Sequence, residues 1–178
     1  PASNPQNVNT LSSGTNYEFY VRADCGSGDY SNWTGPYTFT TPQVPVSTFP
    51  YTEDWESGQG DWQFSNSSAT NQWAVGSAIN NGGSQSLYVS EDGGTSHSYN
   101  NSSNSVVHAY RDFSIPSGNP NIELSFDWLA DGEGCCDYMN VFIAPTSFVP
   151  VEGDVISTSG SAPTGVIQLG GDFNEQLS

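Results

Sequence analysis

The chain has 178 residues, and 19 acidic side chains against two arginines and no lysine give it a formal net charge of −17. A protein that binds nucleic acid or adsorbs to anionic membranes needs a basic surface, so this charge excludes both classes. The apolar runs are too short for a transmembrane helix, and we expect no membrane insertion. An aromatic content of 13% with abundant Ser, Thr, Asn and Gly favours a folded, all-β chain.

The first predicted segment covers residues 1–42 and contains two strands. Residues 17–23 alternate apolar and polar side chains, as a half-buried strand does, and residues 37–40 repeat the pattern. Two strands do not make a stable domain alone, so we expect this segment to be the end of a larger sandwich.

Residues 11–23, Leu-Ser-Ser-Gly-Thr-Asn-Tyr-Glu-Phe-Tyr-Val-Arg-Ala, resemble the end of a fibronectin type III domain. In that family a Leu-x-x-Gly-Thr-x-Tyr stretch introduces strand F, and the resemblance implies that Tyr17 forms the tyrosine corner. Residues 33–41 are similar to the last strand of the same domain. The resemblance further implies that the first half of the domain is missing here, and that Cys25 has its partner upstream of Pro1.

Residues 43–50 form the predicted linker, which together with Pro42 contains three prolines that keep it extended and stiff. Residues 51–178 form the second segment, where short β-type runs are separated by Gly, Asn and Ser clusters. This pattern predicts a β-sandwich or jelly roll, with Leu124, Phe126 and Trp128 facing its core. The runs are residues 73–75, 86–90, 105–113, 122–129, 138–143 and 165–170.

The second segment resembles the MAM-like jelly rolls through Glu-Asp-Trp-Glu at residues 53–56, Leu-Ser-Phe-Asp-Trp at 124–128 and Asp-Tyr-Met-Asn-Val-Phe-Ile at 137–143. It is similar to the cleaved-adhesin domains of gingipain-type proteins and to choice-of-anchor J domains. Both recur beside fibronectin type III modules in large secreted proteins of Bacteroidetes. The resemblance therefore implies an extracellular or outer-surface location, export by the type IX secretion machinery, and a jelly roll that is incomplete at its C-terminus.

Catalytic motifs are missing from the sequence, and we expect the chain not to be an enzyme. Its two histidines lie in a Gly/Ser/Asn-rich loop and in a predicted strand, without a nucleophile elbow or a paired zinc motif. The adjacent Cys135 and Cys136 have no basic neighbour in the sequence to activate a thiol. They are interpreted as a loop staple or as a bond to a partner outside the chain.

Clustered acids predict calcium, a hard cation that takes several oxygen ligands, although a solvated acidic surface explains any single acid equally well. The predicted ligands are Glu53, Asp54, Glu56 and Asp137. The resemblance supports this set, since related jelly rolls hold a structural calcium near the same opening. Further acid clusters are Asp131 with Glu133, and Glu91 with Asp92. The calcium loop that several relatives carry between their first two tryptophans has no acid in residues 63–72.

Aromatic residues invite a carbohydrate-binding hypothesis, because their rings stack on sugars. The tryptophans at family-like positions are expected in the core, so Tyr99, in a Ser/Asn loop, is the best ligand-binding candidate. The leading hypothesis is a non-catalytic segment of a large secreted or surface adhesin, stabilised by calcium, that binds an extracellular protein or glycan. The alternatives are a carbohydrate-binding accessory module of a polysaccharide-degrading enzyme and an accessory domain of a secreted protease.

Overall fold

The computed structural model describes residues 5–118, 121–159 and 162–176. Every regular element in these ranges is a β-strand, so the predicted all-β class is confirmed. The strands pair into five two-stranded sheets, all antiparallel, rather than into two large layers. The sandwich arrangements therefore stay predictions. No described segment forms a helix of the length and hydropathy needed to cross a membrane.

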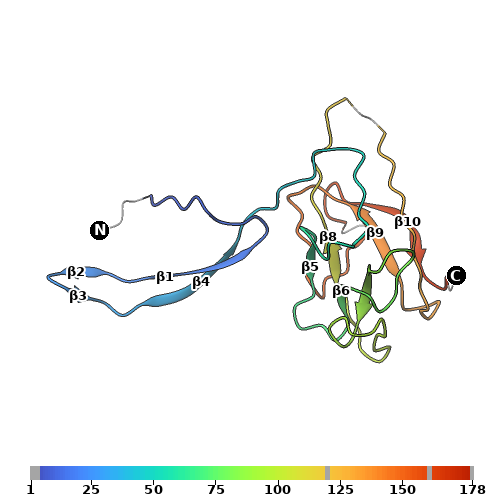
Figure 1. Ribbon diagram of the computed structural model, residues 1–178, viewed down its shortest axis with the longest axis horizontal. Helices are drawn as coiled ribbons and strands as arrows, with labels where there is room; N and C mark the ends of the chain where they lie inside the picture. Colours follow the sequence, from blue (N-terminus) through green and yellow to red (C-terminus); the bar gives the residue numbers. More distant parts are fainter. Residues whose placement is uncertain (1–4, 119–120, 160–161, 177–178) are drawn as a thin grey trace.

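An N-terminal hairpin of residues 16–40, called the arm below, extends away from the rest of the molecule (Figure 1). Cross-strand aromatic pairs line it: Phe19 stacks on Tyr37 with ring centroids 5.2 Å apart, and Tyr17 stacks on Phe39 at 5.9 Å. Phe19 and Tyr37 remain 47% and 48% exposed, because no other sheet of the described chain covers them. The strands of the arm are β1 (Asn16–Val21), β2 (Asp24–Gly26), β3 (Asp29–Tyr30) and β4 (Thr34–Thr40).

The chain enters the arm through a tight turn at Gly14, whose φ of +57° lies in the left-handed region that favours glycine. The Tyr17 hydroxyl accepts the backbone N–H of Ser12 at 2.8 Å. A bond from a tyrosine hydroxyl to the backbone a few residues upstream is the contact that defines a tyrosine corner.

The linker is extended, and it docks onto the rest of the chain instead of acting as a free spacer. The backbone N–H of Val46 donates to the carbonyl of Asp112 at 2.9 Å, and the N–H of Ser114 donates to the carbonyl of Val46 at 2.8 Å. The Gln43 side chain adds a third bond, because its carbonyl oxygen accepts the N–H of Asp112 at 3.0 Å. These contacts fix the end of the arm to the residues that follow β8.

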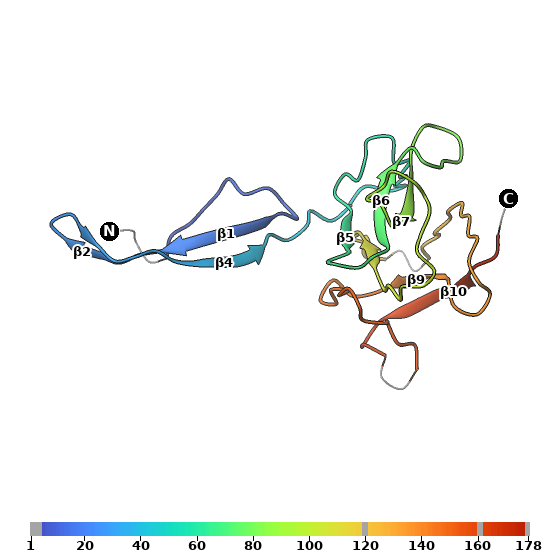
Figure 2. The same cartoon turned by 90° about the horizontal axis from the view of Figure 1, so that it is seen from below.

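Residues 51–176 form the body, in which three two-stranded sheets lie near one another (Figures 1 and 2), with the contacts between strands concentrated within each pair. Its core is thin, because Tyr88, at 7% exposure, is the one buried residue among the described apolar residues. The pairs are β5 (Gln63–Ser65) with β8 (His108–Tyr110), β6 (Gln72–Gly76) with β7 (Ser86–Ser90), and β9 (Met139–Ile143) with β10 (Ile167–Phe173).

The segment predicted as a strand at residues 122–129 differs most from expectation. It forms no ladder with the described residues, and the nearest β-bridge follows it, from Ala130 to Gln176. Phe126 and Trp128 both pack edge-on against Phe173, with ring centroids 5.4 and 5.2 Å away. Leu124 and Phe126 nevertheless stay 56% and 41% exposed, so their predicted burial is wrong. They stay exposed because the segment joins no sheet in the described chain and packs on the two-stranded β9–β10 sheet through Phe126 and Trp128.

Candidate functional site

Glu53, a predicted calcium ligand, lies among aromatic side chains. Its Oε2 accepts hydrogen bonds from the Tyr51 hydroxyl at 2.5 Å and from the Trp62 indole N–H at 3.2 Å, and its Oε1 accepts the N–H of Trp55 at 3.2 Å. Burial, followed by the bond to Glu53, raises the pKa of Tyr51. Glu53 thus links the backbone of Trp55 to the indole of Trp62, and the two indole rings lie with their centroids 5.1 Å apart.

The Glu56 side chain accepts hydrogen bonds from the loop before β7. Its Oε1 accepts the backbone N–H groups of Ser84 and Gln85 at 2.8 and 2.9 Å, and its Oε2 accepts the Ser84 hydroxyl. These bonds, the Ser84 hydroxyl first, lower the pKa of Glu56. A side chain at Gly83 would place its Cβ 2.5 Å from Glu56 Oε1, and the φ of +60° at this residue also favours glycine.

The fit of the predicted calcium ligands can be judged from these contacts. A carboxylate has about four acceptor positions, and Glu53 and Glu56 each use three of them for donors within the protein. Asp54 accepts the N–H of Glu56 at 3.1 Å in a local turn. Among the described residues, no three of Glu53, Asp54, Glu56 and Asp137 bring ligand atoms within 4.8 Å of one another. In this conformation they do not form a calcium cage.

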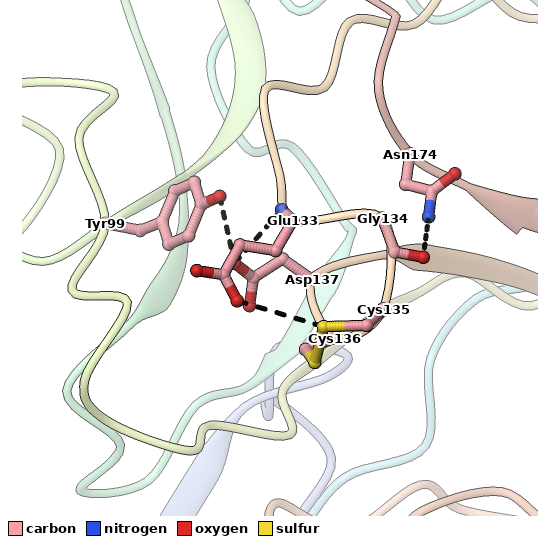
Figure 3. Close-up of a disulfide and its surroundings, with 7 residues drawn as sticks. All are labelled: Tyr99, Glu133, Gly134, Cys135, Cys136, Asp137 and Asn174. Atoms are coloured by element: carbon pink, nitrogen blue, oxygen red, sulfur yellow. Dashed lines mark hydrogen bonds between the residues drawn. A yellow bond between two sulfur atoms is a disulfide. The ribbon is translucent and has the colours of Figure 1, made fainter.

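Asp137 lies instead in the loop of residues 131–137, called the disulfide loop below. The Tyr99 hydroxyl donates to the carbonyl of Asp131 at 3.0 Å and to Asp137 Oδ2 at 3.3 Å (Figure 3). Tyr99 is half-buried rather than fully exposed, and burial, followed by the charge of Asp137, raises its pKa. The structure therefore brings together two predicted site residues, Tyr99 and Asp137, that the sequence placed in separate sites.

Cys135 and Cys136 form a disulfide with each other. Of the two arrangements left open by the sequence, this is the bond within the loop and not the bond to an outside partner. Both cysteines are exposed, and Oε2 of Glu133 lies 3.9 Å from the Cys135 sulfur (Figure 3). Glu133, Cys135 and Cys136 form the one group of potential metal ligands found in the described residues, with ligand atoms within 4.8 Å of one another. Sequence reasoning missed this group because it weighed acids and thiols separately, although the Glu-x-Cys-Cys spacing was visible.

Asp92, from the third acid cluster, organises the loop after β7. Its Oδ1 accepts the Ser90 hydroxyl at 2.7 Å and the N–H of Ser96 at 2.9 Å, and its Oδ2 accepts the Ser96 hydroxyl at 2.9 Å. The N–H and hydroxyl donors of Ser96 and the Ser90 hydroxyl lower the pKa of Asp92. This carboxylate, like Glu56, serves as an anchor for a loop.

Comparisons with known proteins leave the family resemblances as predictions. No protein-family model, no curated protein and no solved structure matches the chain.

Proposed function

We propose that this chain is a non-catalytic binding or display segment of a secreted or surface-exposed bacterial adhesin. The observation that carries the proposal is the succession of a hairpin, a linker and an all-β body (Figures 1 and 2). Aromatic pairs line the hairpin, hydrogen bonds dock the linker, and the body is rich in acids. The bond between Tyr17 and Ser12 supports the likeness of the arm to a fibronectin type III end. An extracellular location and type IX export rest on the same resemblances.

The use of the carboxylates supports a non-catalytic role. A general acid or base must present its carboxyl group to a substrate with a suitably shifted pKa. Three carboxylates of the body instead accept hydrogen bonds from donors within the protein, namely those of Glu53, Glu56 and Asp92. His108 likewise holds a loop, since its Nε2 lies 3.0 Å from the carbonyl of Val151 and 3.1 Å from that of Asp154.

Binding is tested with two immobilised panels, one of extracellular-matrix proteins and one of glycans. The proposal expects saturable binding to a member of either panel and no turnover of peptide or glycoside substrates. Binding to neither panel would overturn the adhesin proposal in favour of a spacer, and turnover that purifies with the chain would overturn the non-catalytic role.

A carbohydrate-binding accessory module is the second candidate, favoured by the position of Tyr99. Its half-buried ring lies beside Asp131 and Asp137, and aromatic rings next to hydrogen-bond acceptors suit a sugar. Tyr99→Ala should abolish glycan binding, whereas Tyr20→Ala, a matched change in the arm, should preserve it. Glycan binding that is unaffected by Tyr99→Ala would remove this residue from the proposal.

Structural calcium is a separate prediction that rests on the resemblance alone, because Glu53, Asp54, Glu56 and Asp137 form no cage in this conformation. An ion that binds only the folded chain raises the melting temperature by mass action. We expect the melting temperature to rise in millimolar calcium and to fall with a chelator, with magnesium as the matched control. Unchanged melting in both conditions would remove calcium while leaving the binding role intact.

A further inference from the structure

The disulfide loop combines sulfur and carboxylate atoms in a small exposed volume. The sulfurs of Cys135 and Cys136 and a carboxylate oxygen of Glu133 all lie within 4.8 Å of one another. A disulfide sulfur carries no proton and is a poor metal ligand, whereas a thiolate is a strong one for soft cations. The ligand capacity of this group therefore depends on the oxidation state of its two cysteines.

We propose that reduction of the Cys135–Cys136 disulfide converts this loop into a binding site for a thiophilic divalent cation such as Zn²⁺ or Cd²⁺. The ligands are the two thiolates and the Glu133 carboxylate, with water completing a four-coordinate shell. In the oxidised protein the two sulfurs are bonded to each other, so the loop does not bind the cation. This inference is independent of the adhesin proposal. Its three ligands are not residues of the Tyr99 site, although Asp131 and Asp137 lie near both sites.

The reaction is balanced by an external dithiol. The dithiol gives two electrons and two protons to the disulfide and becomes a disulfide itself, leaving Cys135 and Cys136 as thiols. The cation then replaces the two thiol protons, which are released to solvent. Both cysteines are exposed, so a reductant and a cation can reach them.

The distances suit a zinc-type site once the sulfur–sulfur bond opens. Metal–sulfur and metal–oxygen bonds of about 2.3 and 2.1 Å place tetrahedral ligand atoms roughly 3.5 Å apart. Glu133 Oε2 already lies 3.9 Å from the Cys135 sulfur. Only the two sulfurs must separate, which reduction permits. Two sulfur ligands favour a soft or borderline cation over calcium, which takes six or more oxygens.

The surroundings hold the loop in place, so the ligands are partly preorganised. A Cβ at Gly132 would lie 2.6 Å from the carbonyl oxygen of Asp137, which shows how tightly the loop closes on itself. The carbonyl of Gly134 accepts the Asn174 side-chain N–H at 3.4 Å, linking the loop to the segment after β10 (Figure 3). The nearby charges of Asp131 and Asp137 add attraction for a cation.

The test uses the Cys25→Ser variant, because Cys25 is the remaining thiol of the chain. A water-soluble phosphine reduces the disulfide, taking its oxygen from water while the sulfurs take the protons. After anaerobic removal of the phosphine, Cd²⁺ is added and the thiolate-to-cadmium absorption is followed in the ultraviolet. We expect one Cd²⁺ per reduced chain and no such absorption from the oxidised chain.

Two substitutions make the assignment specific. Glu133→Gln should weaken cadmium binding by about tenfold or more, by analogy with the loss of metal-supporting groups. Glu18→Gln, the same change of charge in the arm, should leave binding unaltered.

Three outcomes would overturn the proposal. The first is equal binding by the reduced and oxidised chains, and the second is binding that Glu133→Gln does not weaken. The third is loss of the β-type circular dichroism on reduction, because the site requires the folded loop. A synthetic peptide of residues 130–138 that binds as tightly as the protein would refute preorganisation by the fold.

Discussion

In the arm, side chains pair across neighbouring strands and face solvent, whereas in the body, side chains from distant segments bind one another's loops. Phe19 and Tyr37 contact each other directly across β1 and β4. Glu56 and Ser84, by contrast, are 28 residues apart and join two loops. The two regions therefore differ in the kind of contact, strand to strand in the arm and loop to loop in the body, although both are built from short antiparallel strands.

The comparison also shows how a chain with 19 acids and two cations folds. In the described residues the one salt bridge is that of Arg111 with Asp61, at 2.9 Å. Other carboxylates of the body, among them Glu53, Glu56 and Asp92, instead accept hydrogen bonds from N–H and O–H donors, and such bonds to charged acceptors are strong. In the arm, Arg22 lies over the Tyr30 ring, 3.9 Å from its centroid, and the acids stay exposed. The stability of the body should thus depend on hydrogen bonds to its carboxylates and on its small core.

The largest effect is expected from Tyr88→Ala, because Tyr88 is the one buried apolar residue of the described body. Removing a buried aromatic ring leaves a cavity and costs about 3–5 kcal/mol. The change also removes the hydroxyl that donates to the carbonyl of Gly94 at 2.6 Å. Denaturant unfolding followed by tryptophan fluorescence measures the loss. The matched control is Tyr30→Ala in the arm, and a loss below about 1 kcal/mol for Tyr88→Ala would contradict a core centred on this ring.

A smaller loss is expected from Ser90→Ala. Ser90 is 1% exposed, and its hydroxyl oxygen accepts the N–H of Gly94 at 2.9 Å while donating to Asp92. Leaving a buried donor without a partner costs about 1–3 kcal/mol. Chemical denaturation compares this variant with Ser77→Ala, an exposed serine in the turn after β6. Equal stability of the two variants would show that the Asp92 loop contributes nothing to the body.

Strands with a local signature could be predicted from the sequence. The alternation in residues 17–23 and 37–40 corresponds to β1 and β4, and the run at 86–90 is β7. The run at 122–129 has the same alternation and yet forms no ladder. A strand needs a partner with free backbone groups, and alternation does not reveal whether the fold supplies one.

The residues of the candidate site could be predicted from the sequence, but the contacts between them could not. Tyr99 and Asp137 were each singled out by residue type, but their contact joins residues 38 apart and depends on tertiary structure. The same holds for Glu56, where composition suggests a metal ligand and the fold supplies N–H donors instead. In a chain rich in acids, residue type alone does not separate an anchor from a ligand.

The pH dependence of stability should separate the body from the arm. The pKa of Glu56 in the folded chain lies below its ordinary value of 4.5, so its contribution is present above that value and is lost as the pH falls through the folded-state pKa. Glu56→Gln should therefore lower the melting temperature at neutral pH, and its difference from the unmodified chain should shrink in acid. Melting curves from pH 7 to about pH 3 measure this difference.

Glu123→Gln is the control for this pH series, since its exposed carboxylate makes no hydrogen bond with the described residues. It should shift the melting temperature little at any pH. A Glu56→Gln variant whose difference from the unmodified chain grows toward acid would contradict the anchor role.

The smallest effect on the body is expected from Phe19→Ala in the arm. The change removes the stacking of Phe19 on Tyr37, and an aromatic pair contributes about 0.5–1.5 kcal/mol beyond its buried area. Backbone amides of β1 and β4 should exchange with solvent deuterium faster, while exchange in β6 and β7 stays unchanged. Tyr20→Ala, at the next position along β1 and so on the opposite face, is the control and should leave exchange near that of the unmodified chain. Faster exchange throughout the body after Phe19→Ala would show that the linker contacts at Val46 couple the two regions into one cooperative unit.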